Sequence, residues 1–223
     1  MVSNVFYRGP ADLPERISVF PLEGALLLPR GELPLNIFEP RYLQMIDDAL
    51  AGLRLVGMIQ PRNGDGADGS NPSLYDIGCL GRLTQLGETG DGRYLITLTG
   101  IARFRVREEL AATTPYRQCR VDYAPFAVDF VSHGGEDDVD RDALLRTLAA
   151  YLEANRIEAD WNGIRDAPTE ALVNGLSMMS PFGSKEKQAL LEAPDLKSRA
   201  ELLIAVTEFA LAGSDEDGET TVQ

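Results

Sequence analysis

The sequence predicts an α+β protein, with a mixed pseudo-β-barrel followed by a helical bundle, from three observations. Residues 15–125 hold several short runs in which apolar and polar residues alternate, which is the period of a strand with one face on a core. Residues 138–211 repeat apolar positions every three or four residues, as amphipathic helices do. Between them, residues 131–142 contain two glycines and a cluster of acids. We therefore expect two domains, 15–125 and 138–211, with flexible termini at 1–14 and 213–223.

The segment from Phe20 to Leu50 carries the densest structural signals. Leu33, Leu35 and Ile37 alternate with other residues and predict a strand. A helix is expected from Pro40, because proline suits the first helical turn, and Gly52 marks its end. The side chains expected on its apolar face are Tyr42, Ile46, Ala49, Leu50 and Leu53.

Other periodic runs complete the predicted elements. Further strands are expected at 17–22, 53–59, 77–86, 93–99 and 117–123, and helices around 144–152, 169–179, 184–191 and 194–211. The Gly- and Asp-rich segment 63–73 predicts a mobile loop. Its spacing does not match a calcium-binding loop, so no metal is expected there.

One predicted strand face is basic. Arg103, Arg105 and Arg107 alternate with Phe104 and Val106. We interpret this face as solvated and paired with nearby carboxylates, because no broad basic patch surrounds it. The formal net charge is −14, which disfavours binding to nucleic acids and to anionic membranes.

The charge is unevenly divided along the chain. Residues 1–130 carry 13 Arg and 16 acids, whereas residues 131–223 carry 8 basic residues and 19 acids, or net charges of −3 and −11. No signal-like leader and no apolar stretch of about 18 residues is visible, so a soluble, cytoplasmic protein is expected. Cys79 and Cys119 lie in strand-like runs and are expected to be reduced core thiols.

Several motifs resemble one family. The stretch FPLEGALLLPRGELPLNIFEPRYLQMI, residues 20–46, resembles the amino-terminal, substrate-recognition domain of Lon proteases. The G-x-x-R spacing of Gly100 and Arg103 extends the resemblance, as do K-Q-x-L-L-E at 187–192 and R-x-x-x-L-I at 199–204. The resemblance implies that the predicted barrel is PUA-like and that the chain recognises proteins.

Catalytic patterns are not found in the sequence. There is no G-x-x-x-x-G-K-[ST] phosphate loop, so we expect no ATPase of the kind that full-length members of the resembled family carry, and we do not expect their serine–lysine protease domain either. The single histidine, His133, lies in the linker, and the G-L-S pattern around Ser177 falls within a predicted helix, not at a strand-to-helix turn. We expect no catalytic residues, no metal and no cofactor.

The leading hypothesis is a non-enzymatic module that binds exposed hydrophobic peptide segments or a partner protein. The candidate binding residues are Leu26, Leu27, Leu28, Phe38 and Tyr42, and the competing interpretation is that all five are core. Of the two aromatic residues, we expect Phe38 to be core and Tyr42 to be partly exposed. Two other functional classes stay open: a hydrolase or small-ligand enzyme with a site in the inter-domain cleft, and an RNA-binding protein, which the acidity disfavours.

Overall fold

A computed structural model describes residues 5–62 and 72–218, with side chains described as far as residue 212. The expected mobile loop at 63–73 therefore lies largely outside the described residues. The strands are β1 (Arg16–Pro21), β2 (Glu32–Ile37), β3 (Leu55–Ile59), β4 (Ile77–Glu88), β5 (Tyr94–Leu110) and β6 (Gln118–Asp122). The α-helices are α1 (Pro40–Ala51), α2 (Arg141–Ala154), α3 (Trp161–Asp166), α4 (Thr169–Met179), α5 (Ser184–Glu192) and α6 (Leu196–Gly218). Short 3₁₀ helices are η1 (Pro10–Asp12), η2 (Ala124–Phe130) and η3 (Glu136–Asp138).

The six strands form one sheet that closes on itself. Their order is β2-β5-β4-β3-β1-β6, and β5 also pairs with β6, which closes the barrel. Only β1 and β3 are parallel among the described pairings, so the sheet is mixed as predicted. The two runs expected as separate strand segments at 93–99 and around Arg103 are one 17-residue strand, β5. Its length lets it pair with β2, β4 and β6.

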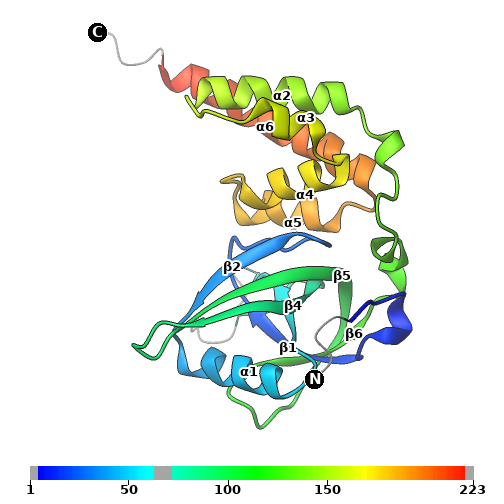
Figure 1. Cartoon of the computed structure of the whole chain (residues 1–223), viewed down its shortest axis with the longest axis vertical. Coiled ribbons are helices and arrows are strands. Elements are labelled where there is room, and N and C mark those ends of the chain that lie inside the picture. Colours follow the sequence, from blue (N-terminus) through cyan, green and yellow to red (C-terminus); the bar gives the residue numbers. More distant parts are fainter. Residues whose placement is uncertain (1–4, 63–71, 219–223) are drawn as a thin grey trace.

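The helices α2 to α6 stand together on one side of the barrel, while α1 lies at the opposite side (Figure 1). The helix predicted from Pro40 and the helix predicted at 169–179 have the expected bounds. The short helix α3 was not predicted, and α6 continues to Gly218, so part of the tail expected to be flexible is helical. At the other terminus, Leu13 is buried, which is more order than a flexible arm implies.

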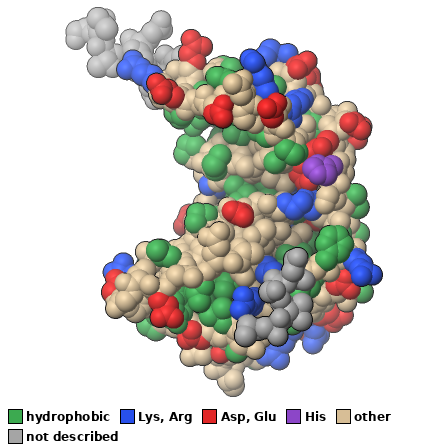
Figure 2. All heavy atoms as spheres, viewed as in Figure 1, with side chains coloured by type: hydrophobic (Ala, Val, Ile, Leu, Met, Phe, Trp, Pro, Cys, Tyr) green, Lys and Arg blue, Asp and Glu red, His purple; other side chains and the backbone are tan. Residues whose placement is uncertain are grey.

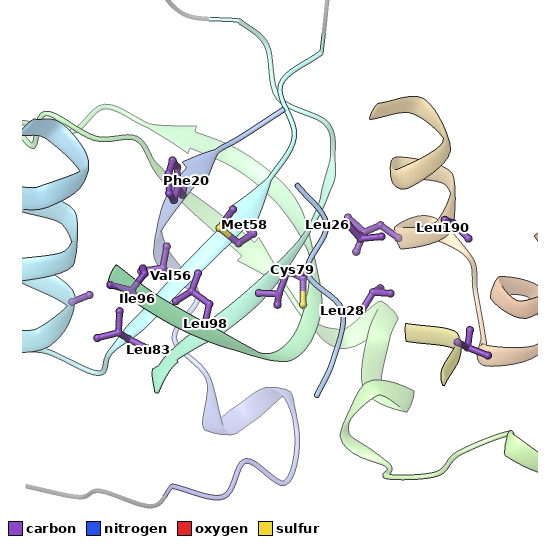
Figure 3. Packing of buried hydrophobic residues seen from close by; sticks show 14 of the residues in the cluster. Phe20, Leu26, Leu28, Val56, Met58, Cys79, Leu83, Ile96, Leu98 and Leu190 are labelled. Atoms are coloured by element: carbon purple, nitrogen blue, oxygen red, sulfur yellow. The ribbon is translucent and has the colours of Figure 1, made fainter. Parts of the chain in front are cut away.

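One hydrophobic cluster runs from the barrel into the helices. Leu26, Leu27 and Leu28 lie in the loop between β1 and β2 and are at most 2 % exposed. Leu26 and Leu28 lie between the strands and Leu190 of α5 (Figure 3). The apolar loop therefore forms a middle layer that joins barrel and helices. The boundaries 15–125 and 138–211 remain a prediction.

A second hydrophobic cluster occupies the other part of the barrel and includes Cys119 and Phe104. Cys79 belongs to the first cluster, and both cysteines are buried and unpaired, as expected. Burial raises the pKa of both thiols, which keeps them protonated and unreactive near neutral pH.

The expectation for the two aromatic residues is wrong, because the structure reverses it. Tyr42 is only 6 % exposed, and its ring centroid lies 4.2 Å from that of Phe20. Phe38 is 61 % exposed, because it directly follows Ile37, the inward-facing last residue of β2, and the side chains of consecutive residues in an extended chain face opposite sides. Leu53 is also exposed, since it follows Gly52 and no longer obeys the helical period.

This reversal predicts opposite outcomes for two alanine substitutions. Tyr42→Ala removes a buried aromatic ring and should lower the free energy of unfolding by about 3–5 kcal/mol. Phe38→Ala removes an exposed ring and should change it by less than about 1 kcal/mol. Urea unfolding of both variants measures the difference. Equal destabilisation by the two substitutions would show that the side chains are not packed as described.

Candidate functional site

Four of the five predicted binding residues are not at the surface. Leu26, Leu27, Leu28 and Tyr42 are buried in the hydrophobic cluster, so the structure supports the competing interpretation that they are core. Burial raises the pKa of the Tyr42 hydroxyl, as expected for a phenol removed from water. Phe38 is the one member of the set that a partner could reach in this conformation.

An apolar opening lies within the helical part instead. It is a groove of about 450 Å³ between α2, α4 and α6. Almost all of its lining is apolar side chain: Leu144, Leu148, Tyr151, Leu152, Ile157, Leu176, Met179, Pro181, Leu203 and Ile204, with Thr147, Ser180 and Thr207. Its volume falls in the usual range for ligand sites.

The groove arises from the spacing of apolar residues on α2. Leu144 and Leu148 are one turn apart and form its buried floor, and Tyr151 and Leu152 continue the same face one turn later. This face would need a neighbouring helix along its whole length to be covered. The groove is the part of this apolar face that α4 and α6 do not cover.

The rim of the groove exposes large apolar side chains. Met179, the last residue of α4, is 78 % exposed, and Ile157 in the segment after α2 is 49 % exposed. The molecule is hollowed on one side between the helices and the barrel, and hydrophobic side chains gather along the helical wall of this hollow (Figure 2). A contiguous exposed apolar surface of this kind marks an interaction site more often than a single exposed residue does.

A buried ion pair holds the helices against the barrel. Arg103 of β5 is 1 % exposed and forms two-pronged contacts with Asp129 of η2, with Nη2 to Oδ1 at 2.8 Å and Nε to Oδ2 at 2.9 Å. The same guanidinium donates to the carbonyl oxygens of Leu191 and Ala193, at the end of α5. The prediction that Arg103 is solvated is therefore wrong, because η2 covers this part of β5. Its pairing with a carboxylate was predicted.

A second arginine extends this junction into the helices. Arg199 of α6 is buried and donates to the carbonyl oxygen of Leu190 and to Oδ1 of Asn174, each at 3.0 Å. Asn174 in turn donates to the carbonyl oxygen of Pro29 at 3.1 Å. Burial, and to a smaller extent the nearby Arg103, lowers the pKa of the Arg199 guanidinium to about 10. These bonds connect α4, α5 and α6 to the loop that enters β2.

An additional contact lies nearer the surface of the junction. Arg30 pairs with Glu170 of α4 and donates to the carbonyl oxygen of Asp129 at 2.7 Å. The backbone N–H of His133 also donates to Glu170, at 3.2 Å. Charged groups from the loop before β2, from β5 and from α6 thus hold α4, the end of α5 and α6 against the barrel.

The serine and the histidine considered as catalytic candidates are not arranged for catalysis. Ser177 is fully buried, and its Oγ donates to the carbonyl oxygen of Val173 at 2.7 Å, so it is not presented as a nucleophile. His133 is largely exposed, with Nδ1 3.2 Å from Glu136. Within residues 5–62 and 72–218, no three His, Cys, Asp or Glu side chains come together as a metal site would require. In that same part of the chain, every helix is too short or too polar to cross a membrane.

Sequence reasoning found the apolar faces of the groove but not the groove itself. The helical spacing of apolar residues in this part of the sequence predicts one shared face, formed by Leu144, Leu145, Leu148, Tyr151 and Leu152. In the helix at 169–179, the spacing of Leu172, Val173, Leu176 and Met179 predicts that all four point inward, and this is wrong for Met179, which is exposed. The omission has a physical reason: periodicity shows that a face is apolar, but only the arrangement of neighbouring helices decides whether it is covered.

The six-stranded mixed barrel with a helical unit packed beside it defines the class of fold. Residues 16–207 match the family described as the ATP-dependent protease La (LON) substrate-binding domain, and the chain belongs to this family. Among named relatives, Lon protease 2 of Sorangium cellulosum is 29% identical over 212 residues, covering 88% of this chain and 25% of the relative. Lon protease 2 of Myxococcus xanthus is 28% identical over 202 residues, covering 86% and 23%. The chain thus spans about a quarter of these relatives.

Solved structures confirm the fold. The Lon N-terminal domain protein from Xanthomonas campestris aligns with a TM-score of 0.60 at 20% identity, covering 85% of this chain and 97% of that one. The N-terminal domain of the Mycobacterium avium complex Lon protease aligns with a TM-score of 0.64 at 18% identity, covering 86% and 98%. The predicted family and the α+β fold are therefore confirmed.

The buried junction predicts a strong effect of removing its central charge. Arg103→Met leaves the Asp129 carboxylate buried without its cation and should lower the free energy of unfolding by about 3–5 kcal/mol. The matched control is Arg107→Met on the same strand, where the exposed pair with Asp122 should contribute less than about 1 kcal/mol. Chemical denaturation of both variants provides the comparison. Similar losses for the two would mean that Arg103 is not the anchor of the junction.

Proposed function

We propose that this chain is a non-enzymatic recognition module that binds exposed hydrophobic segments of other proteins in the groove between α2, α4 and α6. The observation that carries the proposal is an open apolar groove of about 450 Å³ in a member of the Lon substrate-binding family. An unfolded or partly folded protein exposes the apolar side chains that such a groove can bury. Burial of those side chains supplies the binding free energy.

The composition of the rim supports binding of varied segments. Met179 lines the groove and Met178 precedes it, half-buried against Gly31. Methionine is unbranched and polarisable, so its side chain adapts to partners of different shape. A site that must accept many sequences gains from such adaptable contacts.

The groove is also held by a rigid scaffold. Its floor residues Leu144 and Leu203 belong to the same hydrophobic cluster as the barrel core, and the Arg103–Asp129 pair fixes the start of α6 through the end of α5. A preformed site loses less conformational entropy on binding than one that must be assembled. Phe38 remains a candidate for an additional contact because it is exposed.

Two exposed residues provide a direct test of the groove. Met179→Glu places a charge on the apolar rim and should weaken binding of an apolar peptide by about 1–2 kcal/mol, or roughly 5- to 30-fold. The control is Phe209→Glu, because Phe209 is 82 % exposed on α6 but does not line the groove. Fluorescence anisotropy with a labelled Leu- and Phe-containing peptide measures the affinities, and thermal melts confirm that both variants are folded.

The outcomes separate the groove from other surfaces. Loss of affinity in Met179→Glu alone supports the proposal. Unchanged affinity in Met179→Glu, or an equal loss in both variants, would exclude the groove as the peptide site. A loss in Phe38→Ala alone would assign binding to the barrel instead.

The non-enzymatic part of the proposal has its own test. The sequence contains no phosphate-binding loop, so the purified chain should neither hydrolyse ATP nor cleave an unfolded protein such as casein. Phosphate release and gel analysis measure the two activities. Turnover that follows the protein through successive purification steps would overturn the assignment.

A further inference from the structure

We infer that the free edge of β2 binds an extended segment of the partner protein as an added strand of the barrel sheet. The inference rests on the proposed function and deepens it, because it specifies the conformation of the bound chain and a second surface that holds it. It follows from the backbone groups that β2 leaves without partners.

β2 is an edge strand among the pairings that the structure describes. It pairs with β5 on one side, and no described strand pairs with it on the other. The strand runs along the side of the barrel that faces α4 and α5 (Figure 1), at the hollow that Figure 2 shows between barrel and helices. β2 therefore borders the same hollow as the groove wall.

Pro34 shows which backbone groups of β2 point to the free edge. It lies opposite Thr97 of β5 and has no N–H, so these two residues form a non-hydrogen-bonded pair of the antiparallel ladder. Hydrogen-bonded and non-hydrogen-bonded pairs alternate along such a ladder. Leu33 and Leu35 therefore direct their N–H and C=O groups toward β5, and the residues between and beside them direct theirs away from it.

The free edge thus offers the N–H groups of Glu32 and Asn36 and the carbonyl oxygens of Glu32, Pro34 and Asn36. All three residues are exposed. Within residues 5–62 and 72–218, no hydrogen bond to these backbone groups is found. Donors and acceptors that alternate in this way match the backbone of an extended polypeptide.

The apolar layer under β2 is also incomplete. Leu33 and Leu35 are only partly buried, whereas Leu98 and Ile96, their direct partners on β5, are 0 % and 3 % exposed. A strand added beside β2 would cover Leu33 and Leu35 with its own side chains on the inner face. Because every second side chain of a strand lies on that face, we expect the bound segment to carry apolar residues at alternate positions.

The edge is continuous with the groove. Met178 packs against Gly31, the residue before β2, and Met179 lines the groove. Both methionines belong to the end of α4, so a chain that leaves the groove at Met179 meets the first residues of β2. One segment can therefore occupy the groove and continue along the edge.

A second copy of this chain fits the edge less well. Antiparallel pairing of two β2 strands about their centre places one Pro34 opposite the other. Neither proline can donate, so the central pair of hydrogen bonds is lost. An extended segment of another protein has no such restriction.

Amide hydrogen exchange tests the edge directly. The isotope-labelled chain is saturated with a peptide that carries Leu and Phe at alternate positions, and the exchange of each backbone N–H is followed by NMR. The N–H groups of Glu32 and Asn36 should exchange at least about tenfold more slowly with peptide bound, because they then donate to its carbonyl oxygens. Those of Leu33 and Leu35, which already donate to β5, are the internal reference.

Two substitutions at one position separate the backbone from the side chain. Asn36→Pro removes one of the free N–H groups and should weaken peptide binding about three- to tenfold. Asn36→Ala keeps the N–H and should leave the affinity nearly unchanged. Thermal melts check that both variants are folded, and if Asn36→Pro is not, the exchange measurement on the unsubstituted chain decides.

The outcomes separate the inference from the proposed function. If the peptide does not bind, both fail. If it binds and Met179→Glu weakens it, but Glu32 and Asn36 exchange at unchanged rates, the proposed function stands and the inference is wrong. Slower exchange at both N–H groups, with unchanged affinity in Met179→Glu, would support the edge and exclude the groove.

Two further results would overturn the inference. One is equal affinity of the folded Asn36→Pro and Asn36→Ala variants for the peptide. The other is slow exchange at Glu32 and Asn36 without peptide that increases with protein concentration, because this would assign the edge to a second copy of the chain.

Discussion

The guanidinium of Arg103, buried between β5, η2 and the end of α5, is the contact on which the arrangement of this molecule depends. It forms a paired contact with Asp129 and donates to three backbone carbonyl oxygens, so nearly all of its hydrogen-bonding capacity is used. The Phe126 ring covers it, with the guanidinium carbon 4.8 Å from the ring centroid. A charge that is removed from water this completely is tolerated only while every partner stays in place. The pair therefore fixes one orientation of the helices on the barrel.

The groove follows from that orientation. The apolar loop of Leu26 to Leu28 fills the space between barrel and α5, and Arg199 and Asn174 connect α6 and α4 to the same loop. With α4 and α6 held in this way, part of the apolar face of α2 has no neighbour. The interior is thus tightly specified by apolar packing and buried hydrogen bonds, while the face that remains open is apolar, adaptable and available to a partner.

Much of this fold could be predicted from the sequence. The strand alternation at Leu33 to Ile37 and the proline that begins α1 gave the correct elements, and the motif around residues 20–46 gave the correct family. The motif arginines Arg103 and Arg199 proved to be buried anchors of the junction. Their burial could not be predicted, because it depends on partners that only folding brings near. Asp129, the partner of Arg103, and Asn174, the partner of Arg199, lie in other elements of the chain.

The candidate site was harder to predict for a related reason. An apolar residue in a loop, such as Leu26, can belong to the core or to a binding surface. Whether it is buried depends on the helices that pack against the loop. Strand alternation could have placed Phe38 outward, since its neighbour Ile37 lies on the inward face. The groove depends on three helices and on what they leave uncovered, which is a property of tertiary structure.

The location of the bound segment is the most direct test of this account. An isotope-labelled sample of the chain can be titrated with a neutral apolar peptide while the backbone amide resonances are followed by NMR. The account predicts that the largest shifts occur in the groove-lining parts of α2, α4 and α6, with little change in the barrel strands other than β2. Shifts concentrated around Phe38 and the β2–β5 face, with the three helices unchanged, would contradict it.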